Sequence, residues 1–191
     1  MRIIGGEAKG RTLHFPSGSK ERPTSDFLRE ALFNLLGSLQ NKTFLDLFAG
    51  SGSVGLEAAS RGAQGVCFVE KNKHLVEVIK KNIQKCCLDK KCRIIAGDIE
   101  FGLHDLFRKR NEFDIIFADP PYSQDLLKET LKFLSKYHVL KEDGVIVIQH
   151  SIKENFTEII DENIYQTDQR KYGDNALTFL KWSGNDTGNF R

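Results

Sequence analysis

Between residues 43 and 149, short apolar segments alternate with segments whose apolar residues recur at helical spacing. The apolar segments are typical of buried strands, which we predict at 43–48, 65–70, 93–96, 113–118 and 144–149. The segments between them predict helices over 53–60, 72–86, 98–108 and 124–135. Strands that alternate with helices form a mainly parallel sheet with both faces covered. We therefore predict a doubly wound α/β fold.

Both ends of the chain depart from this alternation. Residues 1–24 are basic and rich in glycine, and alternation over 11–15 predicts a short strand. Residues 24–26 offer a helix N-cap, and Gly37 a stop. Segments 157–166 and 176–182, separated by 172–175, predict an antiparallel pair at the sheet edge. We predict a basic N-terminal extension (1–24), one domain (25–182) and a flexible tail (183–191).

The cysteines and the longest apolar segments indicate a cytoplasmic protein. The four cysteines contain no CxxC pair, so we expect reduced thiols and no metal ion. No segment approaches 18 consecutive apolar residues, and the start of the chain lacks the apolar core of a signal peptide. The net charge of +2 is too small to identify a partner.

A glycine-rich segment follows the first predicted strand. Gly50, Gly52 and Gly55 form a GxGxxG pattern, and Glu70 lies 20 residues after Gly50. Glycines permit a tight turn and close approach to a ligand, and the acid suits a ribose hydroxyl. The alternative for Glu70 is an ordinary acid at a strand end. Between a strand and a helix, this pattern predicts a cofactor that contains adenosine.

Two further acids distinguish between such cofactors. Asp46 precedes the glycines within the predicted strand, where a carboxylate would repel a pyrophosphate. Asp98 follows the third strand and could accept a hydrogen bond from an adenine amine, cap the next helix, or do both. S-adenosylmethionine is cationic and carries no phosphate, so the acids favour it over NAD.

The tetrapeptide Asp119-Pro120-Pro121-Tyr122 follows the fourth predicted strand. Two prolines stiffen the backbone and remove two N–H donors, which leaves acceptors beside a carboxylate. Such a site suits an amino group, which offers two donors. We predict that Asp119 and the Pro120 carbonyl hold the amine, while Tyr122 stacks on the base. If a methyl group is transferred from S-adenosylmethionine to this amine, the ammonium product is strongly acidic, so a general base is not required.

The sequence resembles the RsmD family, the bacterial methyltransferases of guanine N2 in 16S ribosomal RNA. The resemblance extends from Met1 to about Trp182 and is carried by residues 1–6, 9–11, 22–26, 29–34, 45–55, 68–71, 119–122 and 172–174. The DPPY motif alone is shared with DNA adenine methylases, and the N-terminal block narrows the match. An adenine-N6 DNA methyltransferase and an NAD-dependent oxidoreductase are the alternatives.

The resemblance implies a class I S-adenosylmethionine-dependent methyltransferase fold, Rossmann-like, with a seven-stranded sheet. It implies that ribosomal RNA, within the small subunit or its assembly intermediate, is the partner, and an exposed base-binding face favours a monomer. The implied cofactor-binding residues are Asp46, Phe48, Ala49, Gly50, Gly52, Glu70, Lys71, Asp98, Ile99 and Asp119. The implied RNA-binding residues are Arg2, Lys9, Arg11, Arg22 and Thr24.

Two features have no assigned role. Gln149-His150-Ser151 stands where family members often carry a glutamate, and His150 is either a base for the departing proton or a packed side chain. Eight Lys and Arg residues over 71–93 form either a solvated helix face or a phosphate contact.

Overall fold

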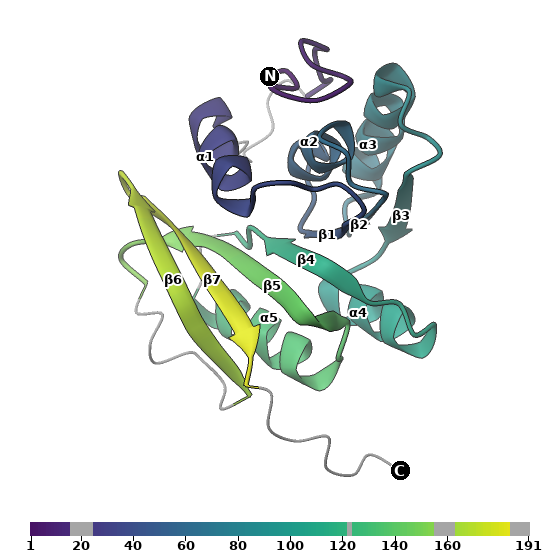
Figure 1. Cartoon of the computed structure of the whole chain (residues 1–191). Coiled ribbons are helices and arrows are strands. Elements are labelled where there is room, and N and C mark those ends of the chain that lie inside the picture. The colour runs from purple at the N-terminus through teal and green to yellow at the C-terminus, as the bar shows by residue number, and fades with distance from the viewer. Residues whose placement is uncertain (16–24, 122–123, 155–162, 184–191) are drawn as a thin grey trace.

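The computed structural model describes residues 1–15, 25–121, 124–154 and 163–183. In these residues seven strands form one sheet in the order β3-β2-β1-β4-β5-β7-β6 (Figure 1). The strands are β1 (Thr43–Leu47), β2 (Gly65–Glu70), β3 (Cys92–Ala96), β4 (Phe113–Ala118), β5 (Leu140–Ser151), β6 (Ile164–Tyr172) and β7 (Asn175–Trp182). Strands β1 to β5 pair in parallel, and β7 pairs antiparallel with β5 and β6. The predicted class I methyltransferase architecture is confirmed.

Helices cover both faces of the sheet (Figure 1). One face carries α1 (Asp26–Leu36), α2 (Ser53–Ser60) and α3 (Lys73–Cys86), and the other carries α4 (Ile99–Arg108) and α5 (Gln124–Lys136). Successive residues of a strand point to opposite faces, so the sheet has a separate core on each face. In β1, Phe44 packs into the core beneath α1–α3, and Leu45 packs into the core beneath α4 and α5. Among the described helices, none combines the length and apolar character of a membrane span.

The predicted edge pair exists, but one strand lies later in the chain than predicted. Strand β6 runs from Ile164 to Tyr172, so it overlaps the predicted segment only at 164–166. Residues 157–162 of that prediction lie outside the described part of the chain. The turn is also shorter than predicted, because Tyr172 already pairs with Asn175 around Gly173, whose φ is 59°. Most residues of β6 are exposed, and its sequence does not alternate between apolar and polar residues. The prediction relied on such alternation and therefore placed the strand too early in the chain.

The predicted strand at 11–15 is wrong. Only an isolated bridge between Arg2 and Thr12 forms there. Instead, Ile3, Ala8 and Leu13 are buried in the same core as residues of α1, α2 and α3. Residues 1–15 therefore pack onto the domain, while the predicted boundary at residue 24 lies outside the described residues.

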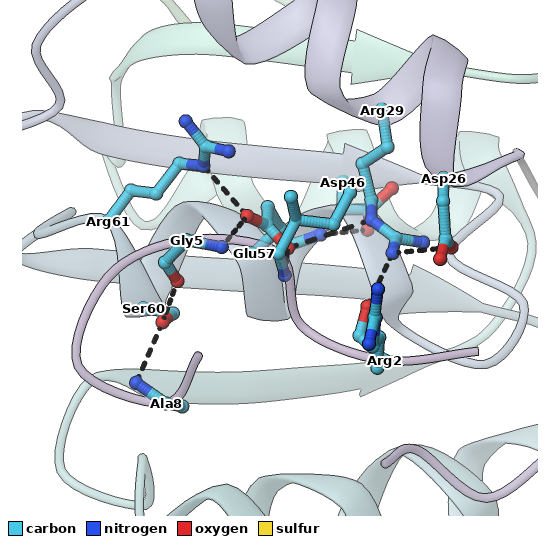
Figure 2. Close-up of polar contacts among 11 residues, drawn as sticks. Arg2, Gly5, Ala8, Asp26, Arg29, Asp46, Glu57, Ser60 and Arg61 are labelled. Atoms are coloured by element: carbon cyan, nitrogen blue, oxygen red, sulfur yellow. Dashed lines mark hydrogen bonds and ion pairs between the residues drawn. The ribbon is translucent and has the colours of Figure 1, made fainter. Parts of the chain in front are cut away.

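Polar groups of α2 hold the backbone of this N-terminal segment (Figure 2). The buried Glu57 carboxylate accepts hydrogen bonds from the Ile4 and Gly5 amides, each at 2.8 Å. Ser60 Oγ donates to the Gly5 carbonyl at 2.6 Å and accepts from the Ala8 amide at 2.9 Å. These contacts satisfy backbone groups that no neighbouring strand reaches.

A fully buried arginine on α1 completes this attachment (Figure 2). Arg29 Nη2 donates to the Arg2 carbonyl at 2.5 Å and to Asp26 at 3.0 Å, and Arg29 Nε lies 3.6 Å from Glu57 Oε2. Glu57 also forms an ion pair with Arg61 at 2.7 Å. Buried charges are tolerated when they are paired in this way. The N-terminal residues are therefore connected to two helices of the domain.

We expect Ser60→Ala to lower the free energy of unfolding by about 2 kcal/mol, because it leaves a buried amide and a carbonyl without their partner. Urea denaturation measures this change. Ser38→Ala is the matched control, since Ser38 is exposed and accepts only a long 3.4 Å hydrogen bond from Gln40. Equal stability of the two variants would show that the Ser60 contacts do not hold the segment.

Candidate cofactor and substrate cavity

A cavity of about 780 Å³ opens at the carboxyl ends of the parallel strands. The segments after β1, β2, β3 and β4 all line it, and Gln149 near the end of β5 does so too. The order of the sheet reverses beside β1, since β2 lies on one side of it and β4 on the other. Open α/β sheets bind ligands at such a switch point.

The turn after β1 forms one wall of the cavity. Phe48 has a φ of 60°, which is rare for a residue with a Cβ atom, and Gly50 has a φ of 56°. The Gly50 amide donates to Glu70 Oε2 at 2.8 Å, which fixes the turn against the end of β2. Phe48, Ala49 and Gly50 line the cavity as predicted.

The other two glycines of the pattern are needed for packing rather than for contact with the cavity. Gly52 is the N-cap of α2, with a φ of 79°, and it is absent from the lining of the cavity among the described residues. A Cβ atom on Gly55 would lie 2.3 Å from the Phe68 ring, so only glycine lets α2 approach β2 this closely.

Asp46 lines the cavity and is almost completely buried. Its Oδ2 accepts a hydrogen bond from the Gly55 amide at 2.8 Å. The pKa of Asp46 is raised to about 8, mainly by burial; the hydrogen bond from the Gly55 amide opposes this shift, and the nearby Asp119 and Glu70 carboxylates add to it. A positive charge in the cavity would stabilise the ionised carboxylate.

The ends of β2 and β3 contribute the two other predicted acids. Glu70 is buried, and its Oε1 accepts from the Asn72 amide at 2.8 Å. Asp98 is exposed, and its Oδ1 caps α4 by accepting from the Phe101 amide at 2.8 Å. Both acids line the cavity, together with Lys71 and Ile99. Asp98 therefore caps α4 and also lines the cavity, so the two roles considered for it are compatible.

The charge of the cavity decides between cofactors. Within the described residues, its lining contains one cation, Lys71, and six carboxylates: Asp46, Glu70, Asp98, Glu100, Asp119 and Glu129. Such a surface repels a pyrophosphate but attracts sulfonium and ammonium groups. The lining therefore fits S-adenosylmethionine and disfavours NAD.

The segment after β4 lies beside this acidic wall. Asp119, Pro120 and Pro121 line the cavity, so the predicted amine-binding residues share one space with the predicted cofactor-binding residues. The Gln149 amide donates from Nε2 to Asp119 Oδ2 at 3.0 Å. Tyr122 lies outside the described residues, and its stacking role stays a prediction.

Several lining residues were not predicted. They come from the N-terminal segment, α1 and its N-cap, α5, β5 and β7, and include Phe15, Ser25, Leu28, Leu126, Glu129, Thr130, Phe133, Gln149 and Asn175. Gln149 could have been found, because it ends a parallel strand next to β4 and all such ends meet at one edge. The α5 and α1 residues carry no motif, and their position depends on how the helices pack.

His150 points away from the cavity. Its Nε2 lies 2.8 Å from Thr178 Oγ1, its Nδ1 lies 2.9 Å from the Ser151 carbonyl, and the side chain is buried. Burial lowers the pKa of His150. His150 is absent from the described lining, so the structure favours a packed histidine over a base for the departing proton.

The predicted RNA-binding residues within the described segments, Arg2, Lys9 and Arg11, are all exposed. Arg11 also has a structural contact, because its Nη1 donates to the Lys85 carbonyl at 2.6 Å and to Cys87 Sγ at 3.1 Å at the end of α3. Arg22 and Thr24 lie outside the described residues.

The lysines of α3 lie on its solvent face. Lys73, Lys80, Lys81 and Lys85 are exposed, whereas the apolar side of the helix is buried. Because Arg11 contacts the end of α3, this face and the N-terminal segment form adjoining basic surfaces.

Comparison with known proteins places the chain in a family. The family described as "Conserved hypothetical protein 95" matches residues 1–181. A Bacillus subtilis (strain 168) protein, provisionally named rRNA methyltransferase YlbH, is 35% identical over 185 residues, covering 96% of this chain and 100% of the relative. The ribosomal RNA small subunit methyltransferase D of Escherichia coli (strain K12) is 34% identical over 154 residues, covering 80% and 76% of the two chains.

A solved structure agrees with these relatives. A hypothetical protein of Thermus thermophilus superposes with a TM-score of 0.79 at 34% identity, over 95% of this chain and 99% of that chain. The shared fold, the cavity and the sequence matches therefore agree. The chain belongs to the conserved hypothetical protein 95 family, the RsmD family of methyltransferases.

Proposed function

We propose that this protein transfers the methyl group of S-adenosylmethionine to the exocyclic N2 of a specific guanine in small-subunit ribosomal RNA. One observation carries the proposal: Asp119 and Pro120, which suit an amine, line the same cavity as Asp46, Glu70 and Asp98, which suit a cationic adenosine cofactor. The name of the Escherichia coli relative supports ribosomal RNA as the substrate.

Each acid has a distinct role in the proposed binding of the cofactor. Glu70 accepts hydrogen bonds from the ribose hydroxyls, and Asp98 accepts one from the adenine amine. Asp46 lies deepest and compensates the positive charge of the ammonium group. When bound, S-adenosylmethionine supplies an activated methyl group on its sulfonium.

The protein contributes to the transfer mainly by orienting the amine. The lone pair of guanine N2 is delocalised into the ring, so the nitrogen is a weak nucleophile. Asp119 and the Pro120 carbonyl accept its two N–H groups, which favours a pyramidal nitrogen with its lone pair directed at the methyl group. The surplus proton leaves to water, since His150 lies outside the cavity lining.

RNA is proposed to bind through the basic N-terminal residues. Arg2, Lys9 and Arg11 are exposed on a segment whose last described residue, Phe15, lines the cavity. Contacts from such residues to phosphates position a nucleic acid without reading its sequence. A guanine from a structured loop would then enter the cavity unpaired. In this proposal, residues 1–24 form the RNA-contacting extension, residues 25–182 form the methyltransferase domain, and residues 183–191 form a tail.

Mass spectrometry of ribosomal RNA tests the proposal. Cells that lack the protein should lack one N2-methylguanosine in the small-subunit RNA, and the purified protein should restore it on small subunits from those cells. Methylation of duplex DNA in place of this RNA would favour the adenine-N6 alternative. Tight binding of NAD without binding of S-adenosylmethionine would overturn the proposal.

The affinity for S-adenosylmethionine is expected to rise with pH up to about 8, the pKa of Asp46 in the ligand-free protein. A cationic ligand lowers the pKa of this carboxyl, so binding near pH 7 releases a proton. Above pH 8 the carboxyl is already ionised, and its contribution to the pH dependence ends. Calorimetry in two buffers with different ionisation enthalpies measures the number of protons released.

Asp46→Asn is the control for this pH dependence. Asparagine keeps an oxygen that can accept from the Gly55 amide, but it does not titrate. The amino group of the ligand titrates in the measurements on both the wild type and the variant. The difference in the number of protons released is therefore due to Asp46. Identical proton release by the variant and the wild type would refute the assignment.

A further inference from the structure

The Gln149 amide lies directly beside the residue proposed to hold the amine. Ile148 of β5 pairs in register with Ala118 of β4, so Gln149 follows on β5 where Asp119 follows on β4. The Gln149 side chain is 5% exposed and lines the cavity. Its Nε2 donates to Asp119 Oδ2 at 3.0 Å. The two side chains form a connected pair on the cavity wall.

The other half of this amide lacks a partner. Gln149 Oε1 is buried and has no hydrogen bond to any group in the described part of the chain. A buried acceptor without a donor costs about 1–3 kcal/mol, so such groups are rare unless a ligand uses them. Rotating the amide would not help, because Oε1 would then meet the Asp119 carboxylate. The bond to Asp119 therefore fixes which atom of Gln149 remains an acceptor.

We propose that Gln149 determines specificity for guanine by accepting the ring N1–H next to the target amine. This inference rests on the proposed function and goes beyond it, because it assigns the recognition of the base to a particular residue. On guanine the N2 amine and N1–H are adjacent donors. On adenine and cytosine the ring nitrogen beside the amine is an acceptor. A carboxylate beside an amide oxygen matches only the first pattern.

A modified base separates recognition of N1–H from recognition of the amine. 2,6-Diaminopurine keeps the 2-amino group of guanine, but its N1 carries no hydrogen and an amino group replaces O6, so a Gln149 variant is needed to assign the effect to N1. The test uses small-subunit RNA assembled with either guanosine or 2,6-diaminopurine riboside at the methylated nucleotide, once mass spectrometry has mapped that nucleotide. We expect the wild-type protein to methylate the diaminopurine RNA about 10- to 100-fold more slowly, since its N1 lone pair would face Gln149 Oε1.

Substitution of Gln149 assigns this preference to the residue. Gln149→Leu should methylate the two RNAs at rates within about threefold of each other, because neither base then meets a buried acceptor. Asn175→Ala is the matched control, since it removes a different amide from the cavity lining and should keep the preference for guanosine. Thermal melting establishes that both variants are folded.

The outcomes separate this inference from the proposed function. Equal wild-type rates on the two RNAs would overturn the role of Gln149 while leaving guanine-N2 methylation intact. A Gln149→Leu protein that keeps the full preference would also overturn it. Failure of the wild type to methylate the guanosine RNA would overturn the proposed function, and this inference with it. Equal wild-type rates are measured without any variant, so this result can overturn the role of Gln149 even if Gln149→Leu does not fold.

Discussion

Replacing Asp119 with alanine is expected to lower the single-turnover rate of methyl transfer to RNA by about 10³-fold, at saturating S-adenosylmethionine. The carboxylate lines the cavity next to Pro120. In the proposed function it supplies a charged acceptor for the reacting amine. Without it, the amine loses an interaction that becomes stronger as its lone pair turns towards the methyl group. Such an interaction acts on the rate of transfer more than on binding.

Asparagine at position 119 should not rescue the reaction. Gln149 Nε2 donates to Asp119 in the wild type, so the oxygen of an asparagine would face Gln149. Its NH2 group would then point a donor at the donors of the substrate amine. We therefore expect Asp119→Asn to lower the single-turnover rate about as much as Asp119→Ala does. If only the shape of the side chain mattered, Asp119→Asn would keep most of the rate.

Asp98→Ala is the complementary control for Asp119→Ala. Asp98 lines the cavity at the end of β3, away from the strand that carries Asp119. Its loss should weaken cofactor binding, while the rate at saturating cofactor stays within about tenfold of wild type. Asp119→Ala should show the reverse pattern, with a loss of transfer rate that is much larger than any loss of cofactor affinity measured by calorimetry. An Asp119→Ala protein that transfers methyl groups at the wild-type rate would exclude the proposed orientation of the amine.

The positions of the acidic residues could be predicted because they follow from strand order. Asp46, Glu70, Asp98 and Asp119 each stand within or just after an apolar segment, and parallel strands bring their carboxyl ends to one edge. Apolar segments buried on both faces also have clear limits, so the predicted strands at 65–70 and 113–118 match β2 and β4.

The N-terminal segment could not be predicted from local pattern. Its apolar residues suggested a strand at 11–15, but they pack against helices, and its backbone bonds go to Glu57 and Ser60, more than 50 residues away. The family resemblance implies that Arg11 binds RNA, and the structure shows that Arg11 also contacts the end of α3. Contacts of this kind depend on the completed fold and leave no periodic signal in the sequence.

Gln149 could be predicted only in part, unlike the acidic residues, whose positions could be predicted, and the N-terminal segment, which could not. Its place at the end of a parallel strand could be predicted, but its partner could not, because the contact with Asp119 depends on the register between β4 and β5. That register contains an irregularity between Phe113 and Ile115, which no local pattern indicates. The sequence therefore predicted the edge of the sheet at which the site lies more securely than the contacts between its side chains.

Replacing Glu70 with alanine is expected to weaken S-adenosylmethionine binding by about 10²- to 10⁴-fold, because two charge-assisted hydrogen bonds to the ribose are worth about 1.5–3 kcal/mol each. The two carboxylate oxygens accept the Gly50 and Asn72 amides, each at 2.8 Å, and each oxygen retains a second lone pair for a ribose hydroxyl. Glu70 therefore shapes the turn after β1, and in the proposed function the same carboxylate oxygens contact the ribose.

Two further variants separate these roles of Glu70. Glu70→Gln keeps one acceptor oxygen but presents an NH2 group to one of the two amides, so its affinity should fall between those of wild type and Glu70→Ala. Glu100→Ala is the matched control, since Glu100 lines the same cavity but is exposed and paired with Lys136 at 3.3 Å. Calorimetry on proteins of verified thermal stability measures all three affinities. If Glu70→Ala bound the cofactor as tightly as Glu100→Ala, Glu70 would be a structural acid at a strand end, and the adenosine would have to be held by other residues of the cavity.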